Sequence, residues 1–496
     1  RIIFYSQQAG TKMNYTPKTA FYDHQRTTLE QCAMEKYWGL FLEMGVGKSK
    51  IAIDNFALLS EKNLIDTVLV LAPKGVYDNW VQKEIPAHLP DRIKHKIARW
   101  QPNLTEKFKE EMRQIVFRKN REAGTLHILV MNIEALSTTK GTATATKYLK
   151  ENPKNMMIVD ESTTIKNRKS IRSKNVVKVG KEALYKRILT GSPVTKSPLD
   201  LYAQCEFLGL SALGFKSFFS YRNRYAVIQQ RYMGAKSFQE ITGYQRLDEL
   251  NEKLNGFTTR ILKSECLDLP DKVYLKREVP LTTEQKNLYV QMKKLALSQL
   301  EDGSLATTAS VLTQIMRLQQ ICCGFLQPDD EPIQEIKNNR LNELLSVADE
   351  VQGKVIIWSS WTHDIRLIAE ALRRRFGNKA AATYYGGTPQ DERQDIVKDF
   401  QDPDSELRFF VGQPRTGGFG LTLTAATTVI YYSNSYDLEI RLQSEDRAHR
   451  ISQTKTVTYV DLVSPDTIDE KILKALRAKI DIAGQVLGED IKQWLI

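Results

Sequence analysis

The sequence predicts an α/β protein of two domains, each built on a parallel β-sheet, with helical segments inserted between or upon them. Its 496 residues exceed what one small hydrophobic core organises. The composition, 42% hydrophobic and 26% charged, is typical of a folded globular protein. Short apolar, β-branched runs alternate with helical patterns in two separate regions of the chain. Such alternation indicates parallel sheets covered by helices on both faces.

Each region supplies a set of expected strands, which end in polar, glycine or proline turns. Those of the first region are VLVLAP (68–73), LHILVMN (126–132), MMIVDE (156–161) and RILTGSP (187–193). Those of the second are KVIIWSS (354–360), ATYYGG (382–387), LRFFVG (407–412), TVIYYSN (428–434) and VTYVDLV (457–463). A helix is expected after Thr362, because apolar residues recur there on one face and Gly377 then provides a C-cap. The apolar residues are Ile365, Ile368, Ala369, Leu372 and Phe376.

The stretch between the two regions, 197–345, has a different composition. It is rich in Leu, Lys, Glu and Gln, has few β-branched runs, and suggests helices. The charged, turn-like segment SECLDLPDK (264–272) is the expected connection between the domains. The expected boundaries are 1–263 for the first domain, with a helical insertion over 197–260, and 264–496 for the second, with helical segments over 281–345 and 468–496.

Composition excludes several classes of protein and favours one kind of partner. No apolar stretch approaches the ~20 residues that span a bilayer, so no membrane partner is expected. The five cysteines show no C-x-x-C pair and the six histidines no metal-ligand spacing, which argues against a zinc site or a histidine-held catalytic metal. A net charge of +12, with an isoelectric point near 9.2, favours polyanions, above all nucleic acid.

The stretch EMGVGKS (43–49) is a candidate phosphate-binding loop. A strict Walker A loop needs a glycine where this chain has Leu42, so a chance Gly-Lys-Ser is the rival interpretation. An apolar, strand-like run precedes the loop and a helix-compatible run follows it. Backbone N–H groups and a helix N-terminus would then face the phosphates. Lys48 is expected at the β- and γ-phosphates and Ser49 on Mg²⁺.

Two further stretches suit the same chemistry. Asp160 and Glu161 follow an apolar strand, where acidic residues can hold Mg²⁺ and position a water, although alone the pair could merely cap a turn. Arg447 and Arg450 share a helix face and could stabilise transition-state charge, although alone they could belong to a solvated charged helix. The glycine-rich stretch 417–429 suits close approach of backbone to phosphates. Together the stretches predict an ATPase that uses ATP and Mg²⁺.

In this order the motifs resemble those of superfamily 2 helicases, specifically the Swi/Snf-type ATPases, over about residues 20–475. The matching stretches are YDHQ (22–25), EMGVGKS, APKGVYDNW (72–80), MNIEAL (131–136), VDEST (159–163), LTGSPV (189–194), KVIIWSS, NNRLNELL (338–345), YYGGTPQDERQDIVKDF (384–400) and the contiguous stretch 417–457. The last is the most specific, because its Gln-x-x-Asp-Arg-x-His-Arg-Ile-x-Gln arrangement is closer to the Swi/Snf group than to DEAD-box RNA helicases. The helicase form of the loop does not need the outer glycine, which accounts for Leu42.

The resemblance implies two RecA-like domains with ATP in the cleft between them, and it assigns roles to residues. The catalytic residues would be Lys48, Asp160, Glu161, Arg447 and Arg450. ATP would contact Gln25, which reads adenine, and also Met44, Gly45, Val46, Gly47, Lys48, Ser49, Gly418 and Gln443. Ser49 and Asp160 would hold Mg²⁺, and Thr190 and Ser192 would couple hydrolysis to movement. Nucleic acid would contact Pro73, Lys74, Asn132, Ser359 and Thr422.

Three functions stay open at this point. The resemblance favours an ATP-dependent motor that translocates on double-stranded DNA and remodels protein–DNA complexes, since no wedge-like hairpin is identified in the sequence. The alternatives are a strand-separating helicase on DNA or RNA, and a nucleic-acid-binding ATP switch subunit whose motor has decayed. Little chain remains beyond the motor, so we expect a bacterial or viral source and a cytoplasmic location, with a nuclear location if the source is eukaryotic. The motor is expected to be a monomer.

The chain also departs from the family pattern at several positions. Ser192 and Ser452 stand where Thr and Gly are usual, Thr422 replaces an Asn, and Gln413-Pro414-Arg415 replaces a segment that usually contains Ser-Thr. None of these departures removes a catalytic group. They bear on nucleic-acid contacts and coupling rather than on ATP hydrolysis.

Overall fold

The computed structural model describes residues 2–5, 12–74, 76–101, 106–116, 121–209, 212–233, 236–301, 308–327, 332–417 and 421–487. The chain forms two compact units. The first comprises Arg1–Leu267 with Asp481–Ile491, and the second comprises Asp268–Ile480 with Lys492–Ile496. Among the described helices, none is long and apolar enough to cross a membrane.

The first unit contains a seven-stranded sheet in which every pair of neighbouring strands is parallel. The strand order is β11-β3-β8-β7-β4-β6-β5. The strands are β3 (Tyr37–Leu42), β4 (Thr67–Ala72), β5 (His95–Arg99), β6 (Leu126–Asn132), β7 (Asn155–Asp160), β8 (Tyr185–Leu189) and β11 (Thr258–Ile261). The four strands expected from apolar runs are β4, β6, β7 and β8, and they lie together inside the sheet.

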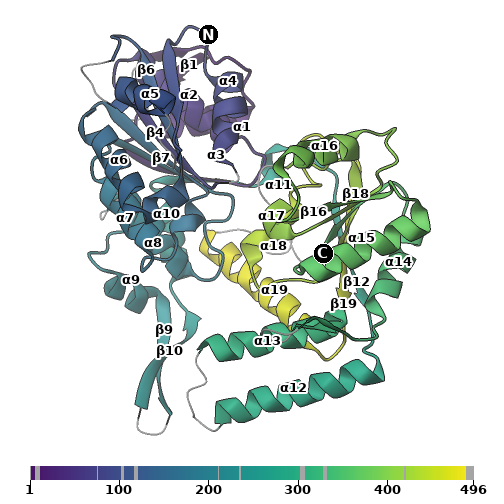
Figure 1. Cartoon of the computed structure of the whole chain (residues 1–496). Coiled ribbons are helices and arrows are strands. Elements are labelled where there is room, and N and C mark those ends of the chain that lie inside the picture. The colour runs from purple at the N-terminus through teal and green to yellow at the C-terminus, as the bar shows by residue number, and fades with distance from the viewer. Residues whose placement is uncertain are drawn as a thin grey trace. The chain divides into compact units, whose positions relative to one another are not determined.

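Helices cover both faces of this sheet (Figure 1). Successive side chains of a strand point to opposite faces, so Val68 and Val70 of β4 join the core under α2, whereas Leu69 and Leu71 join the core under α6 and α7. The longer helices of the unit are α1 (Asp23–Cys32), α2 (Lys48–Glu61), α5 (Glu106–Val116), α6 (Thr139–Lys150), α7 (Ile171–Gly180), α8 (Leu201–Leu208), α9 (Phe218–Tyr225) and α10 (Leu247–Asn255). The shorter ones are α3 (Tyr77–Asn79), α4 (Ile85–His88) and α11 (Lys263–Cys266).

The second unit contains a six-stranded sheet, again parallel throughout, with strand order β12-β19-β18-β15-β17-β16. Its strands are β12 (Lys272–Glu278), β15 (Lys354–Trp358), β16 (Ala381–Tyr384), β17 (Phe409–Gly412), β18 (Ala426–Tyr431) and β19 (Val457–Val463). Its helices are α12 (Thr283–Glu301), α13 (Thr308–Cys323), α14 (Arg340–Glu350), α15 (Thr362–Phe376), α16 (Gln390–Gln401), α17 (Pro414–Gly417), α18 (Leu438–Glu445) and α19 (Ile468–Leu487). The two-sheet parallel α/β architecture predicted from the sequence is therefore confirmed.

The helix expected after Thr362 is confirmed as α15. Its apolar face, including Ile365 and Leu372, is buried against β15. Gly377 ends the helix with φ 111°, a value that suits glycine.

The prediction of an insertion made only of helices is wrong. Between α9 and α10 the chain forms an antiparallel ribbon of β9 (Ala226–Met233) and β10 (Lys236–Tyr244). Locally the sequence contains β-branched and aromatic residues such as Phe238, Ile241, Thr242 and Tyr244, which favour strands. The surrounding Leu- and Glu-rich helices dominate the composition of the wider window and hide this local enrichment. A second short strand pair, β13 (Phe325–Leu326) and β14 (Gln334–Glu335), follows α13.

Candidate ATP site and nucleic-acid contacts

The candidate phosphate loop joins the end of β3 to the start of α2. Gly45 and Gly47 adopt φ values of 79° and 95°, a region that L-residues rarely enter. A Cβ atom at Gly47 would also lie 2.3 Å from Nε2 of Gln25. Glycine is therefore required at position 47 for two reasons: the backbone conformation and the close approach of the Gln25 side chain. The loop turns directly into α2, so that the helix N-terminus and its unpaired N–H groups lie at the loop.

Lys48 and Ser49 are the first two residues of α2. The Lys48 ammonium donates to the backbone carbonyls of Leu42 (3.0 Å), the last residue of β3, and Glu43 (3.3 Å), the residue after it. These contacts fold the side chain back over the loop. Ser49 is half-buried beside it. A cation and a hydroxyl are thereby placed at a helix N-terminus, an arrangement suited to phosphate groups.

Gln25 contacts the loop itself. Its side-chain Nε2 donates to the Val46 carbonyl at 3.4 Å, and its Oε1 accepts from the Tyr22 N–H at 3.3 Å. The His24 ring also hydrogen-bonds to the Val46 carbonyl, at 3.0 Å. Both side chains come from the first turn of α1, so this helix contacts the loop. Met44 and Val46, also expected to contact ATP, are buried within the loop.

Asp160 ends β7 and is almost fully buried. Its Oδ2 accepts from the indole N–H of Trp80 at 2.8 Å, and its Oδ1 accepts from the backbone N–H of Glu161 at 3.0 Å. Burial raises the pKa of the Asp160 carboxyl, while the Trp80 hydrogen bond and the charge of Lys48 oppose that rise. Lys48 of the loop thus favours the ionised form of the carboxyl that ends β7.

Glu161 has a strained backbone, with φ 47° and ψ 60°. A non-glycine residue in this left-handed region costs about 1 kcal/mol or more, and such strain persists where the surrounding structure enforces it. The preceding β7 and the following 3-10 helix Ser162–Ile165 fix the position of Glu161. Strained residues of this kind cluster at functional sites, where Glu161 is expected to act.

Thr190 and Ser192 follow β8 and pack on the phosphate loop. The Thr190 N–H donates to the Leu40 carbonyl of β3 at 3.1 Å, and the Thr190 hydroxyl accepts from the Ser192 N–H at 3.1 Å. A Cβ at the intervening Gly191 would lie 3.1 Å from Cγ of Met44. Thr190 is therefore hydrogen-bonded to the strand that precedes the loop, and Gly191, between the two expected coupling residues, lies against Met44 of the loop.

Three residues of the site escape sequence reasoning. Trp80 lies within APKGVYDNW, but its residue type gives no reason to expect a bond to Asp160. Arg260 of β11 donates from Nη1 to the carbonyls of Phe41 (2.8 Å) and Gly191 (3.0 Å). The backbone N–H of Lys263 donates to the Glu43 carboxylate at 2.9 Å. Arg260 and Lys263 come from a segment that lies over 200 residues after the loop, and sequence spacing alone carries no signal of their approach.

In the second unit, α18 and the turns after it carry the expected arginines. Arg447 is buried and donates from Nε to the Gln443 carbonyl (2.8 Å) and from Nη1 to the Leu421 carbonyl (3.0 Å). Arg450 keeps 23% of its side chain exposed. Its guanidinium pairs with the Asp446 carboxylate at 2.9 Å and donates to the Thr422 hydroxyl at 3.3 Å. Arg450 is thus the more accessible of the two.

Gln443 and Gly418 complete the expected ATP contacts. Gln443 is buried, and its side-chain nitrogen has no hydrogen-bond partner among the described residues. Gly418 lies outside the described residues. The helix that carries Gln443 is fixed by Arg441, which pairs with Glu445 (2.7 Å) and Asp461 (2.6 Å) in a buried network.

The expected nucleic-acid contacts of the first unit lie at strand ends. After β4, Pro73 is buried and Lys74 is exposed, with its backbone N–H donating to the Glu134 carboxylate at 3.1 Å. At the end of β6, the Asn132 side chain accepts from the Ala135 N–H at 2.8 Å and caps a short helix. Lys74 therefore has an exposed side chain, whereas the side-chain oxygen of Asn132 is already used within the fold.

In the second unit, Ser359 is fully buried. Its hydroxyl donates to the Asp364 carboxylate at 3.0 Å and lies 3.2 Å from the Ser433 hydroxyl. The Ser359 side chain does not reach the surface. Its burial therefore gives no support to the expected contact with nucleic acid, which stays a prediction. The neighbouring Ser360 is half-buried. The Thr422 hydroxyl accepts from Arg450, which links the two motifs that carry them.

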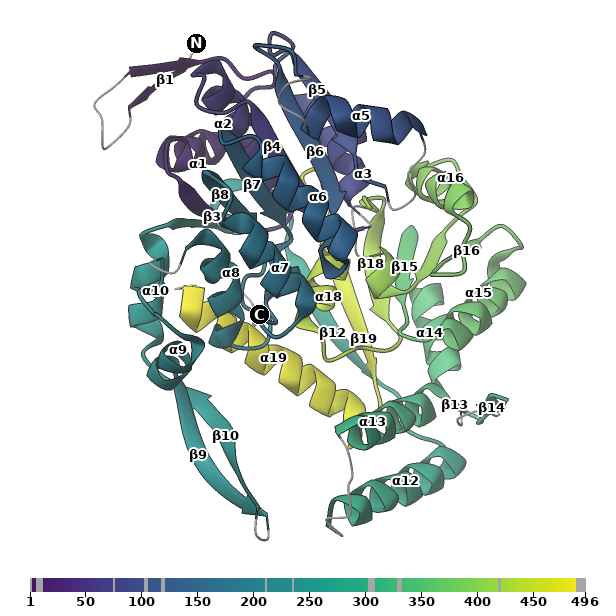
Figure 2. The ribbon, with the colours of Figure 1, turned by 60° about the vertical axis from the view of Figure 1, so that its left-hand side comes forward.

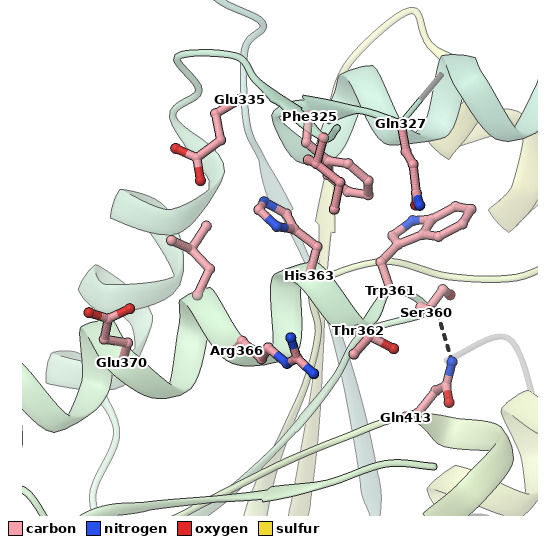
Figure 3. Close-up of a pocket in the computed structure, with 12 residues that line it drawn as sticks. Phe325, Gln327, Glu335, Ser360, Trp361, Thr362, His363, Arg366, Glu370 and Gln413 are labelled. Atoms are coloured by element: carbon pink, nitrogen blue, oxygen red, sulfur yellow. Dashed lines mark hydrogen bonds between the residues drawn. The ribbon is translucent and has the colours of Figure 1, made fainter. Parts of the chain in front are cut away.

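A pocket of about 660 Å³ lies beside Ser360 in the second unit (Figure 3). The ring of Phe325 lies 4.8 Å from that of His363 and 5.9 Å from that of Trp361, centroid to centroid. The side-chain nitrogen of Gln413 donates to the Ser360 carbonyl at 3.0 Å. Gln413, one of the departures from the family pattern, thus ties the segment after β17 to the segment after β15.

Comparison with known proteins agrees with this geometry. A family model described as SNF2-related domain matches residues 29–325, and one described as helicase conserved C-terminal domain matches residues 336–452. The chain is 26% identical over 485 residues to the transcription regulatory protein SNF2 of Saccharomyces cerevisiae, covering 90% of this chain and 26% of that protein. It is 27% identical over 462 residues to a probable ATP-dependent DNA helicase of Arabidopsis thaliana, covering 90% of this chain and 41% of that protein.

A bacterial relative and a solved structure are also similar. An uncharacterised ATP-dependent helicase of Mycoplasma genitalium is 26% identical over 457 residues, covering 90% of this chain and 40% of that protein. A solved SWI2/SNF2 ATPase core of Sulfolobus solfataricus, in complex with double-stranded DNA, is 22% identical with a TM-score of 0.42, covering 97% of this chain and 95% of that one. The chain spans between 26% and 54% of the length of the curated relatives it matches.

The matched models cover both units and include the phosphate loop, the Asp160–Glu161 pair and the arginine helix. The resemblance seen in the motifs is thereby confirmed. Because the SNF2-related model alone covers more than half of the residues, the chain belongs to the SNF2-related family of helicase-like ATPases.

Proposed function

We propose that this chain is an ATP-driven motor that moves along double-stranded DNA and remodels protein–DNA complexes. The observation that carries the proposal is the convergence of Lys48, Asp160 and Thr190 on one loop of the first unit. They follow β3, β7 and β8, which are neighbours in the sheet, so all three lie at its carboxyl edge. That edge is where parallel α/β sheets bind ligands. Such a site binds and hydrolyses a nucleotide, and the family membership identifies the nucleotide as ATP.

The donor set of the site fits Mg²⁺. Asp160 offers a carboxylate and Ser49 a hydroxyl, which are the hard oxygen ligands that Mg²⁺ prefers, and substrate phosphates would complete the coordination. Mg²⁺ bound there would neutralise charge that develops on the phosphate oxygens. The buried Asp160 carboxyl is held by two hydrogen bonds, and these orient it for such a role. Glu161 would orient the attacking water.

The remaining steps are proposed from the family resemblance. Arg447 and Arg450 would complete the site when the second RecA-like domain closes on the first, so that hydrolysis is gated by closure. Nucleic acid would be held through its phosphates, with Lys74 as the exposed cation among the expected contacts. We propose that the motor acts as a monomer.

One assay tests the proposal against its two rivals. The ATPase rate of the purified chain is measured with duplex DNA, single-stranded DNA, RNA or no nucleic acid. Stimulation by duplex DNA, without separation of its strands, supports the translocase. Stimulation by single strands or RNA indicates a helicase, and no hydrolysis under any condition indicates a decayed motor.

We expect the Gly47→Ala variant to lose ATP affinity by about tenfold or more. The alanine must adopt φ near 95°, which is unfavourable for an L-residue, and its Cβ must displace the Gln25 side chain. ATP binding is measured by isothermal titration. The matched control is Gly124→Ala, which has a similar φ of 72° but no atom within 4 Å of the new Cβ. Both variants should lose some thermal stability, and only Gly47→Ala should lose affinity. Equal ATP affinity in the two variants would contradict the assignment.

We expect the Trp80→Phe variant to shift the acid limb of the pH–rate profile to higher pH. The indole N–H stabilises ionised Asp160, so its removal raises the pKa of that carboxyl further above its usual value. Because the ionised form would bind Mg²⁺, the variant should also need more Mg²⁺ for half-maximal rate. kcat/KM is measured against pH at two Mg²⁺ concentrations. A uniform fall in rate at every pH would indicate only a packing defect.

A further inference from the structure

The β9–β10 ribbon projects from the first unit beyond the end of α9 (Figure 2). Eight residues of β9 pair with eight of β10 in antiparallel register, with an irregularity between Ile241 and Gly243. Directly opposed residues share a face, so Tyr232, opposite Ser237, lies on one face and Phe238, opposite Arg231, lies on the other. Each face of the ribbon therefore carries one exposed aromatic ring.

Both faces of the ribbon are exposed. Tyr232 is 77% exposed, Phe238 49%, and Val227 and Ile241 38% each. A two-stranded ribbon alone is at best marginally stable in water, and large apolar side chains on both of its faces have no core to join. Such a pattern indicates a surface that binds something.

The root of the ribbon, in contrast, is firmly held. Tyr221 and Tyr225 of α9 are fully buried in the core of the first unit. The Tyr221 hydroxyl donates to the Pro198 carbonyl at 2.8 Å, and the Gln245 N–H donates to the Tyr225 carbonyl at 2.9 Å. Arg224 pairs with the Glu249 carboxylate at the same place. The exposed ribbon thus extends from a rigid base.

The charge around the ribbon identifies the kind of partner. Residues 216–246 contain six basic residues and one acidic residue, a formal net charge of +5. Arg222 of α9 donates to the Gln239 side chain of β10 at 2.8 Å, and Arg231 of β9 pairs with Glu240 at 2.7 Å, so both cations lie on the ribbon. Cations beside the exposed rings of Tyr232 and Phe238 suit a nucleic acid, because phosphates meet the cations and base edges meet the rings.

We propose that the β9–β10 ribbon is a second DNA-binding element, separate from the helicase motifs, and that it lies in a groove of the duplex. The major groove admits a two-stranded β-ribbon, and aromatic rings on both ribbon faces can contact both groove walls. The inference rests on the proposed function, since it supposes a motor that acts on duplex DNA. The ribbon belongs to the same unit as Thr190 and Ser192. A duplex bound to the ribbon would therefore be bound by the unit that also binds ATP.

The test uses two double variants of the full chain, Tyr232→Ser/Phe238→Ser and Arg222→Gln/Arg231→Gln. Affinity for a fluorescent blunt duplex and for the matching single strand is measured by anisotropy over a range of salt concentrations. The aromatic variant should weaken duplex binding by about fivefold or more, because two apolar side chains no longer contact base edges and thymine methyl groups in the groove. The arginine variant should also reduce the slope of log Kd against log salt by about 0.9 for each phosphate that is no longer neutralised.

The matched control is Ile171→Ser/Arg113→Gln, which removes an exposed apolar side chain and an exposed cation elsewhere on the first unit. All variants should keep the basal ATPase rate measured without DNA. Unchanged duplex affinity in both ribbon variants, or a weakening confined to the single strand, overturns the ribbon inference while leaving the motor intact. If the unaltered chain neither binds duplex DNA nor is stimulated by it, the proposed function itself fails.

Discussion

The Lys48→Ala variant should lose ATP hydrolysis. Lys48 lies at the N-terminus of α2, and its charge acts on the Asp160 carboxyl across the site. Removal of one preorganised donor to developing negative charge typically lowers kcat by about 10²–10³-fold, and here the group removed is a full cation. Turnover should therefore fall to the background of the assay, with or without duplex DNA. Phosphate release is measured under both conditions.

A matched control separates this effect from damage to the fold. Lys62 caps the other end of α2 and is exposed, so Lys62→Ala removes the same charge without touching the loop. Thermal unfolding supplies a second measurement, because a ligand that binds only the folded state raises Tm. Mg²⁺ and ATP should raise the Tm of the control but much less that of Lys48→Ala. Unimpaired turnover in Lys48→Ala would remove the basis of the ATP-site assignment.

Most of the strands that could be predicted from the sequence lie inside the two parallel sheets. β4, β6 and β7 are buried on both faces, so their sequences are continuous apolar runs. In these two sheets the strands that apolar runs do not reveal, β5, β11 and β12, lie at edges, although the edge strand β16 is also predicted. Edge strands carry charged residues, as in KVYLKRE of β12, and their sequences resemble those of loops or helices. Pattern reasoning thus detects burial, and it detects strands only through burial.

The candidate site divides along a similar line. Residues that act through the chemistry of their side chains within a short motif, such as Lys48 and Asp160, could be predicted from residue type and spacing. Residues that act by holding others could not. The Trp80 hydrogen bond to Asp160 and the Arg260 hydrogen bonds to the carbonyls of Phe41 and Gly191 depend on the three-dimensional approach of distant segments. Likewise, the β9–β10 ribbon is not identified in the sequence, because its β-branched and aromatic residues are few and lie among helices.

The Arg450→Ala variant should bind ATP almost normally and hydrolyse it very slowly. An arginine supplied to the transition-state charge typically contributes about 10³–10⁵-fold to kcat, while its contribution to ground-state binding is small. Arg450 suits this role because its side chain is partly exposed and two of its partners, the Asp446 carboxylate and the Thr422 hydroxyl, are side chains that can release it. kcat, KM and the Kd for ATP are measured with saturating duplex DNA. Lys455→Ala, an exposed cation on the same unit, serves as the control.

Arg447→Ala should behave differently, and the comparison tests whether the two arginines act alike. Arg447 is buried, and its guanidinium satisfies the backbone carbonyls of Gln443 and Leu421. Its removal takes the guanidinium donor from both carbonyls, and an unsatisfied buried acceptor costs about 1–3 kcal/mol. The Arg447→Ala variant should therefore lose thermal stability as well as activity. Arg450→Ala should lose less stability, because Arg447 stays 3.8 Å from the Asp446 carboxylate. A large loss of ATP affinity with normal kcat in Arg450→Ala would contradict its role at the transition state. Arg450→Lys would retain the charge but lack the forked geometry, so partial recovery of kcat would separate charge from geometry.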